Sequence, residues 1–509
     1  MAYEPWETQI ASKFLERRHQ ESPEWSHSLV IADPYQIRTN DGEKRLSKLR
    51  SRKEFTTEVV FEPLLTWQNR IRWATRKEAL AAIERVETRS GLSDLDALVF
   101  SDLHLAPRER APYYPPMSKA QALMAAALVM ERVFEAFLHA NPSIVVMIDE
   151  QYLVKNFVAR LADKNNIPIR VFRMARYKRY VKCDHFFLPS AEERLSWAHP
   201  QESQPASQTI FDTSLYERNL SVQEKGRIRR LRVQKISSTV SILRKALTEQ
   251  RRKSKSGPKS RPPEFRHALY WSSSAWRVRV YLLNQSLRLL RYVWMRYPFI
   301  EKADIRRPYV LIPLHVRPES STLTQGPGME DEELVKAVAE ALNSRKLDLQ
   351  CLVLEHPSMI QDRRMRFYRN LRKLPGVAFA DPGLPTPELL GDAAGILTIS
   401  GTAALEGALL DVPVHVVGFP EFLDSISSSG WNELPSFLEA VARGEGPKSG
   451  TRVSLYLKNL EDNAVQMPWS WEAVSTGQKI KETTEGLLEL FDRSFADDSQ
   501  KQIPRDAHR

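Results

Sequence analysis

Short apolar segments alternate with helix-like segments through the second half of the chain, and this alternation constrains the fold more than any other feature. Buried parallel strands are continuous apolar runs, whereas half-exposed strands alternate polar and apolar residues. Five continuous runs occur, with the helix-like segment Glu330–Arg345 after the first: Tyr309–Leu314, Gln350–Leu354, Val377–Ala380, Ile396–Ile399 and Val414–Val417. Strands that alternate with helices predict a doubly wound parallel sheet.

The first half carries the same pattern more weakly. Strand-like runs are Ala97–Phe100, Ile144–Ile148, Ile167–Phe172 and His185–Leu188, and helix-like segments are Lys119–Ala140 and Leu153–Asn165. The chain has 509 residues, whereas one hydrophobic core serves at most about 250–300. We therefore expect an α/β protein with an N-terminal domain at 1–200, a C-terminal domain at 301–490 and a flexible tail at 491–509.

Residues 201–300 interrupt the pattern. Between Lys225 and Arg261 the chain has fourteen Lys or Arg residues and one acid, Glu249, which concentrates much of the net charge of +11. Such a segment buries too little apolar surface to order itself, so a linker or insertion is expected. The segment Trp276–Pro298 fits either a helix packed on the core or an amphipathic helix on an anionic membrane.

Polar loops follow three of the predicted strands in the second half. After Tyr309–Leu314 come His315, Arg317, Glu319 and Ser320, an imidazole, a guanidinium and hydrogen-bonding groups suited to phosphate and sugar oxygens. In open α/β sheets ligands bind beyond the carboxyl ends of the strands. These positions predict a phosphate-binding site, although a polar surface loop would look the same.

The other two loops are shorter. Glu355, His356 and Pro357 end the second strand, where the histidine can donate to a phosphate oxygen. Ser400, Gly401 and Thr402 follow the fourth strand and precede a predicted helix, which either hydroxyl can cap. Gly401 allows close approach to the backbone, the helix dipole favours an anion, and Glu406 lies one helical turn further on, where it can accept sugar hydroxyls.

These three blocks, PLHVRPESST, LEHP and ISGTAALEGALLDVPVHVVG, together resemble the capsule polysaccharide biosynthesis family. That family includes Kdo-transferring glycosyltransferases and is similar to bacterial sialyltransferases. The resemblance covers about residues 307–420 and, more weakly, 95–190. It implies two Rossmann-like domains facing each other across a cleft (GT-B-like). It also implies a nucleotide-sugar donor held by the C-terminal domain, with His356, Ser400 and Thr402 on its phosphate.

The related sialyltransferases carry two acids and a glycine after an N-terminal-domain strand, one acid serving as general base. Here Asp149 and Glu150 follow the predicted strand Ile144–Ile148, but Gln151 replaces the glycine. A carboxylate can take the proton of an attacking sugar hydroxyl. A cap for the following helix is the structural alternative.

No metal or cofactor is expected. Asp94-Leu95-Asp96 has the form of a metal-binding DxD motif, but it precedes rather than ends the predicted strand Ala97–Phe100. The sequence lacks a Walker motif and a GxGxxG fingerprint, which argues against ordinary kinases and dehydrogenases. With no signal-like N-terminus and only Cys183 and Cys351, we expect a cytoplasmic protein, in contact with the inner face of the membrane through 225–261.

Three functions fit these observations. The first is a glycosyltransferase that moves a sugar, CMP-Kdo-like by resemblance, from a nucleotide-sugar donor to a glycan or glycolipid acceptor of a surface polysaccharide. The second is a sugar-nucleotide epimerase or hydrolase with the same architecture. The third is a nucleic-acid-binding protein that uses the basic segment, for which affinity would fall steeply with salt. That third function leaves the three loops unexplained, so no nucleic-acid partner is expected.

Overall fold

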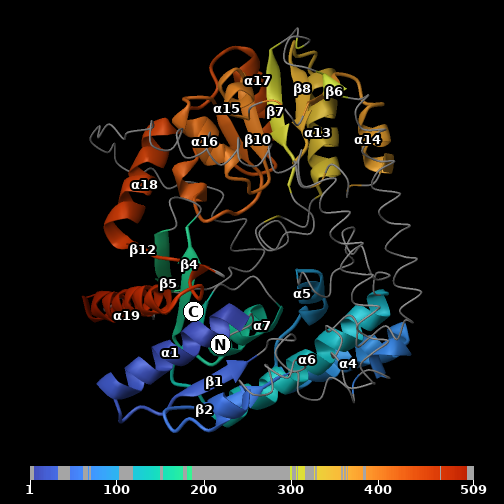
Figure 1. The fold of residues 1–509 in the computed structure, drawn as a ribbon. Coiled ribbons are helices and arrows are strands. Elements are labelled where there is room, and N and C mark those ends of the chain that lie inside the picture. Colours follow the sequence, from blue (N-terminus) through green and yellow to red (C-terminus); the bar gives the residue numbers. More distant parts are fainter. Residues whose placement is uncertain are drawn as a thin grey trace, which may run out of the picture.

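The computed structural model describes residues 5–31, 46–60, 67, 70–101, 118–148, 153–175, 180–185, 299–300, 305, 308–315, 326, 330–356, 359, 363, 365–381, 384, 386–469 and 472–500. The α/β expectation is confirmed, and the described residues form a six-stranded sheet, a four-stranded sheet and a two-stranded sheet, with helices packed around them (Figure 1). We call the part built on the six-stranded sheet the C-terminal half and the part built on the other two sheets the N-terminal half. The cleft expected between the halves depends on residues 149–152 and 316–325, which lie outside the described residues.

The C-terminal half is a six-stranded parallel sheet in the order β11-β10-β7-β8-β9-β6. Its strands are β6 (Phe299–Ile300), β7 (Tyr309–Pro313), β8 (Gln350–Leu354), β9 (Val377–Ala380), β10 (Gly395–Thr398) and β11 (Val414–Val416). Five of the six were predicted within one residue at each end. The order reverses between β7 and β10, because β8 and β9 continue on one side of β7 and β11 on the other.

Helices cover both faces of this sheet, as a doubly wound fold requires. One face packs on α13 (Asp331–Ser344), α14 (Met365–Leu371) and α17 (Leu434–Ala442). The other packs on α15 (Thr386–Gly391), α16 (Ala403–Leu409) and α18 (Gly450–Asn463), and the short 3-10 helix η3 (Leu423–Ser425) lies beside α18. Successive residues of β7 therefore alternate between two apolar cores: Tyr309 and Leu311 point to one, and Val310 and Ile312 to the other.

The N-terminal half has a mixed sheet in the order β12-β5-β4-β3. Its strands are β3 (Val145–Ile148), β4 (Ile169–Met174), β5 (Tyr180–His185) and β12 (Val465–Gln466). Only β3 and β4 are parallel, and β5 is antiparallel to both of its neighbours. A separate parallel pair joins β1 (Ser28–Ile31) to β2 (Thr56–Val59).

The helices of this half are α1 (Pro5–Glu21), α4 (Arg76–Ser90), α5 (Leu95–Ser101), α6 (Lys119–Ala140) and α7 (Leu153–Lys164). Helix α6 has the predicted bounds. It begins with a capping box between Ser118 and Gln121 and ends at Asn141, whose left-handed φ of 39° stops the helix. Local capping signals thus fix the longest helix of this half.

The predicted strand Ala97–Phe100 is wrong, because these residues belong to α5. Leu95, Leu98 and Val99 are buried against the other helices at the i, i+3, i+4 spacing of one helical face. Asp94 and Asp96 therefore flank a helix start and do not end a strand, as the acids of a metal-binding DxD motif would.

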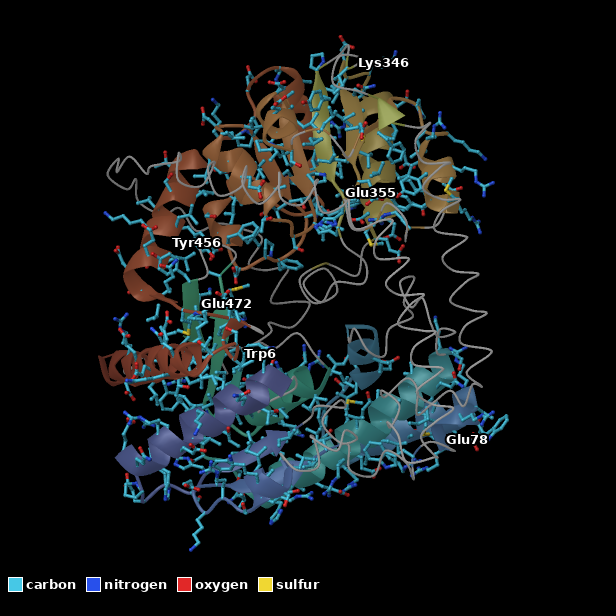
Figure 2. All side chains as sticks on the ribbon, viewed as in Figure 1. Trp6, Glu78, Lys346, Glu355, Tyr456 and Glu472 are labelled. Atoms are coloured by element: carbon cyan, nitrogen blue, oxygen red, sulfur yellow. The ribbon has the colours of Figure 1, made fainter. Side chains whose placement is uncertain are left out.

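The last helix, α19 (Gly477–Gln500), packs beside α1 although it follows the C-terminal half in sequence (Figure 1). Phe14 lies edge-on to Phe491, and Trp6, labelled in Figure 2, lies edge-on to Trp469. The flexible tail expected at 491–509 thus begins with a helical stretch, and residues 501–509 lie outside the described residues. Strand β12 and α19 pack on the N-terminal half, although the sequence placed them in the C-terminal domain.

A buried ion pair anchors α1 to the end of β3. The Lys155 ammonium donates to Glu7 at 2.9 Å and to the Ile148 carbonyl, and both charged side chains are almost fully buried. Breaking such a pair leaves a desolvated charge without compensation.

Replacing Glu7 by alanine should therefore lower the free energy of unfolding by about 3–5 kcal/mol. The matched control is Lys13→Ala on the same helix, which breaks a surface pair and should cost less than about 1 kcal/mol. Urea denaturation measures both variants. Equal effects would contradict the buried-pair description.

His415 on β11 is buried and holds the segment after η3. Its Nδ1 accepts from the Ser428 hydroxyl and its Nε2 donates to the Gly430 carbonyl, each at 2.8 Å. Burial lowers the pKa of His415 to about 4. The imidazole is therefore neutral in the folded protein at neutral pH.

The free energy of unfolding should therefore decrease as the pH is lowered, because of His415. Below about pH 6.5 the imidazole is protonated in the unfolded chain, whereas in the folded chain it stays neutral down to about pH 4. The free energy of unfolding therefore decreases by up to about 3 kcal/mol across that pH range. The variant His415→Gln, followed by urea denaturation from pH 7 to pH 4, should lose less stability than the wild type. Parallel curves would contradict this origin of the pH dependence.

Candidate functional site

The carboxyl ends of β7 and β10 meet where the strand order of the C-terminal sheet reverses. Strand β7 pairs with β8 on one side and with β10 on the other, and β10 leads on to β11. Loops that leave adjacent strands in opposite directions open a crevice at such a point, and ligands bind there in doubly wound folds. The loops predicted to bind phosphate follow β7, β8 and β10, the strands at this position.

His315 connects the two strand ends. Its Nδ1 lies 2.9 Å from Asp331 Oδ1, and its Nε2 lies 3.2 Å from Thr398 Oγ1 and 3.4 Å from the Ser400 backbone nitrogen. Thr398 Oγ1 accepts from the Gly401 amide, so its own hydroxyl hydrogen is free to point to His315. This pattern fits an imidazole that donates from Nδ1 and accepts at Nε2.

Arg363 is the centre of a buried network beneath these loops. Its Nε donates to Glu355 at 2.8 Å, its Nη1 to Asp331 at 3.1 Å, and its Nη2 to the His315 carbonyl at 2.7 Å. The Tyr368 hydroxyl also donates to Glu355. One guanidinium thus joins the end of β7, the end of β8 and the first turn of α13.

The electrostatics of the network favour a fixed arrangement. Burial raises the pKa of the Glu355 carboxyl, while the charge of Arg363 and the hydrogen bonds from Arg363 and Tyr368 act in the opposite direction. Burial opposes the charge of Arg363, but Glu355 and Asp331 outweigh it and raise the pKa of the guanidinium. Burial also raises the pKa of Tyr368, so the phenol keeps its proton and donates it.

The predicted site residues separate into an inner and an outer group. His315, Glu355 and Ser400 are buried, and the oxygens of Glu355 accept from Arg363, Tyr368 and the His356 amide. His356, Gly401, Thr402 and Glu406 are half-buried and form the outer group. In Figure 2 Glu355 lies on the side of the C-terminal half that faces the N-terminal half.

The loop after β10 packs closely against the end of β7 at Gly401. A Cβ at Gly401 would lie 2.7 Å from Thr398 Oγ1 and 3.3 Å from His315 Nε2, so a side chain there would disturb the contact between the loops. Thr402 is the N-cap of α16 but makes no capping hydrogen bond with its side chain, contrary to the expected cap. The Thr402 and Ala403 amides have no acceptor among the described residues.

Six predicted site residues lie outside the described residues: Asp149, Glu150, Arg317, Glu319, Ser320 and Pro357. The basic segment 225–261 also lies outside them. Strand β3 ends at Ile148, so Asp149 and Glu150 do follow a strand as expected. Their role as general base stays a prediction.

Sequence reasoning missed Asp331, Arg363 and Tyr368. Asp331 resembles an ordinary acid in the first turn of a helix, and Arg363 lies in the basic run Arg363–Arg372, which resembles a solvated surface. One signal was present, since Tyr368 and Leu371 have the i, i+3 spacing of a buried helical face.

Within the described part of the chain, no helix is both long and apolar enough to span a bilayer. In the same residues, no three or more His, Cys, Asp or Glu side chains gather as metal ligands would.

A scan of protein-family models and a search of curated proteins find no match. Among solved structures, the chain is similar to the beta Kdo 2,4 transferase of Thermosulfurimonas dismutans KpsC, at 12% identity and a TM-score of 0.29, over 63% of this chain and 84% of that one. It is also similar to the Neisseria meningitidis UDP-GlcNAc 2-epimerase bound to UDP-GlcNAc, at 12% identity and a TM-score of 0.24, over 86% of this chain and 100% of that one.

A third similarity is to a UDP-glucose: anthocyanidin 3-O-glucosyltransferase in complex with UDP, at 11% identity and a TM-score of 0.25, over 97% of this chain and 98% of that one. Scores this low assign neither a family nor an activity.

The network predicts a specific pattern of stability changes. Arg363→Met should lower the free energy of unfolding by about 3–5 kcal/mol, because Glu355 and Asp331 would stay buried without the cation that pairs with them. Adding Glu355→Gln should recover part of that loss, since one uncompensated charge is removed. Urea denaturation of the single and double variants measures this coupling, and strictly additive losses would contradict the network.

Proposed function

We propose that the chain is a metal-independent glycosyltransferase that moves a sugar from a nucleotide-sugar donor to the acceptor of a surface polysaccharide. The observation that carries the proposal is the contact of His315 with Thr398 and Ser400, which joins two polar loops at the reversal of the strand order. A phosphate ester is the ligand that such a loop pair suits best.

The donor phosphate is held by the outer group of the site. The His356 imidazole and the Thr402 hydroxyl supply donors, and the Thr402 and Ala403 amides add backbone donors beside them. Glu406, one turn along α16, accepts from sugar hydroxyls. His315, Glu355 and Ser400 act indirectly by fixing the two loops, and Arg317, Glu319, Ser320 and Pro357 complete the site from the same loops.

The chemical step needs a base on the acceptor side. Asp149 or Glu150 takes the proton of the acceptor hydroxyl as its oxygen bonds to the anomeric carbon. The bond from that carbon to the donor phosphate breaks at the same time, and the leaving phosphate carries the charge. Donors already aimed at this charge stabilise the transition state without reorganisation.

The substrates are inferred from the resemblance and from charge. A CMP-activated acidic sugar of the Kdo type is the proposed donor, and a glycan or glycolipid is the proposed acceptor. The basic segment 225–261 would hold the enzyme at the anionic inner face of the cytoplasmic membrane, where lipid-linked acceptors lie.

The nucleotide is identified first, by thermal shift with CMP, UDP and GDP and their sugars. A ligand that binds only the folded state raises the melting temperature. Turnover of the nucleotide sugar to a new sugar without any acceptor would instead establish the epimerase.

His356→Ala should then weaken binding of the identified nucleotide by about 10–100-fold, because a hydrogen bond to a charged phosphate contributes about 1.5–3 kcal/mol. The transferase rate should fall with it. The control is His139→Ala on α6, whose side chain is 79% exposed and pairs with Glu58 on the surface. Full activity and full donor affinity in His356→Ala would rule out this placement of the donor.

A further inference from the structure

A cavity of about 210 Å³ lies in the N-terminal half, away from the strand ends described above. It is enclosed by α1, β1, the end of α6, β3 and α19. None of its lining residues belongs to the C-terminal sheet, so it is a feature separate from the proposed donor site.

The interior of the cavity is apolar. Its apolar wall comes from four elements, α1, α6, β4 and α19, which contribute Phe14, Val133, Phe137, Phe172, Leu487 and Phe491, all of them buried. Such a wall offers dispersion contacts and no hydrogen bonds, so it suits a hydrocarbon.

The mouth of the cavity has the opposite character. We define it by the lining residues that are exposed: Trp25, Ser26, Ser28, Asn141 and Ser143. An aromatic ring beside hydroxyl and amide groups suits the faces and hydroxyls of a sugar or polyol. The cavity therefore changes from polar at its mouth to apolar inside, as an amphiphile does from head to tail.

Hydrogen-bonding capacity remains near the mouth. Arg18 donates from Nη1 to Asp492 at 2.9 Å and to Glu21 at 3.3 Å, and its Nε and Nη2 have no acceptor among the described residues. His27 Nε2 is buried without a hydrogen-bond partner. Both residues line the cavity.

The charges beside the mouth balance one another. Arg17 and Arg18 oppose Glu21 and Asp492, since Arg17 also lies 3.7 Å from Glu21. Burial, with His19 and Arg18 nearby, lowers the pKa of His27, so the imidazole adds no charge at neutral pH. The surroundings thus favour a head group that is polar but uncharged.

We propose that this cavity binds a neutral amphiphile, with its alkyl chain inside and its hydroxyl-rich head at Trp25 and Asn141. The head lies near Asn141 and Ser143, which precede β3, whereas Asp149 and Glu150 follow it. The head group is therefore placed at the end of β3 opposite the proposed base, while the lining of the cavity continues along β3 to Ile148. The site goes beyond the proposed function and does not require it.

Calorimetric titration of the full chain with octyl β-D-glucoside, below its micelle concentration, tests the proposal. One saturable site is expected, and affinity should rise about fourfold per methylene from hexyl to octyl glucoside, because each buried methylene contributes about 0.8 kcal/mol. Glucose alone should not bind, and octanoate and octylammonium should bind more weakly than the glucoside. An affinity that does not change with alkyl chain length would overturn the proposal, as would equal affinity for octyl glucoside and the charged amphiphiles.

Two variants locate the site. Trp25→Ala should weaken octyl glucoside binding about tenfold, as loss of an aromatic anchor does. The matched control Trp73→Ala removes a tryptophan that is 71% exposed and does not line the cavity, and it should bind like the wild type. Ala11→Phe should abolish binding by filling the cavity. Wild-type affinity in Trp25→Ala would overturn the proposal even if Ala11→Phe failed to fold.

Discussion

The contact of the Arg363 guanidinium with two buried carboxylates and the His315 carbonyl is the interaction on which the C-terminal site depends. These groups belong to the end of β7, the end of β8 and the start of α13, which are far apart in sequence. A buried charge is tolerated only with fixed partners, so the network holds the loops in one arrangement. The half-buried His356, Gly401 and Thr402, which we propose bind the donor, lie next to this network.

A similar device occurs in the N-terminal half. There the buried Lys155 donates to the carbonyl of Ile148, the last residue of β3, and pairs with Glu7 of α1. In each half a buried cation thus binds a carbonyl at a strand end, directly before residues proposed to act on the donor or the acceptor. Helix α19 packs on α1 and β5 after the chain has left the C-terminal half, so the last helix belongs to the core of the N-terminal half.

Much of the C-terminal fold could be predicted from sequence, because each strand is a short apolar run and signals itself locally. Helix α6 could also be predicted, because its capping residues mark both of its ends. The run Ala97–Phe100 was predicted wrongly as a strand, since four apolar residues fit a strand or a buried helix equally well. The role of Arg363 and the docking of α19 could not be predicted, because both depend on contacts between residues distant in sequence. The ends of β7, β8 and β10 were predicted to within one residue, but the burial of His315, Glu355 and Ser400 shows only in three dimensions.

The most direct test of the central claim is hydrogen–deuterium exchange. It is measured with and without the nucleotide sugar that raises the melting temperature of the protein most. Because the proposal joins the loops of β7, β8 and β10 in one phosphate site, saturating ligand should protect the amides of residues 399–404 and those around His356 together. The cavity segment around Trp25 should exchange as before. Unchanged exchange at 399–404 under saturating ligand would contradict the claim, as would protection confined to the N-terminal half.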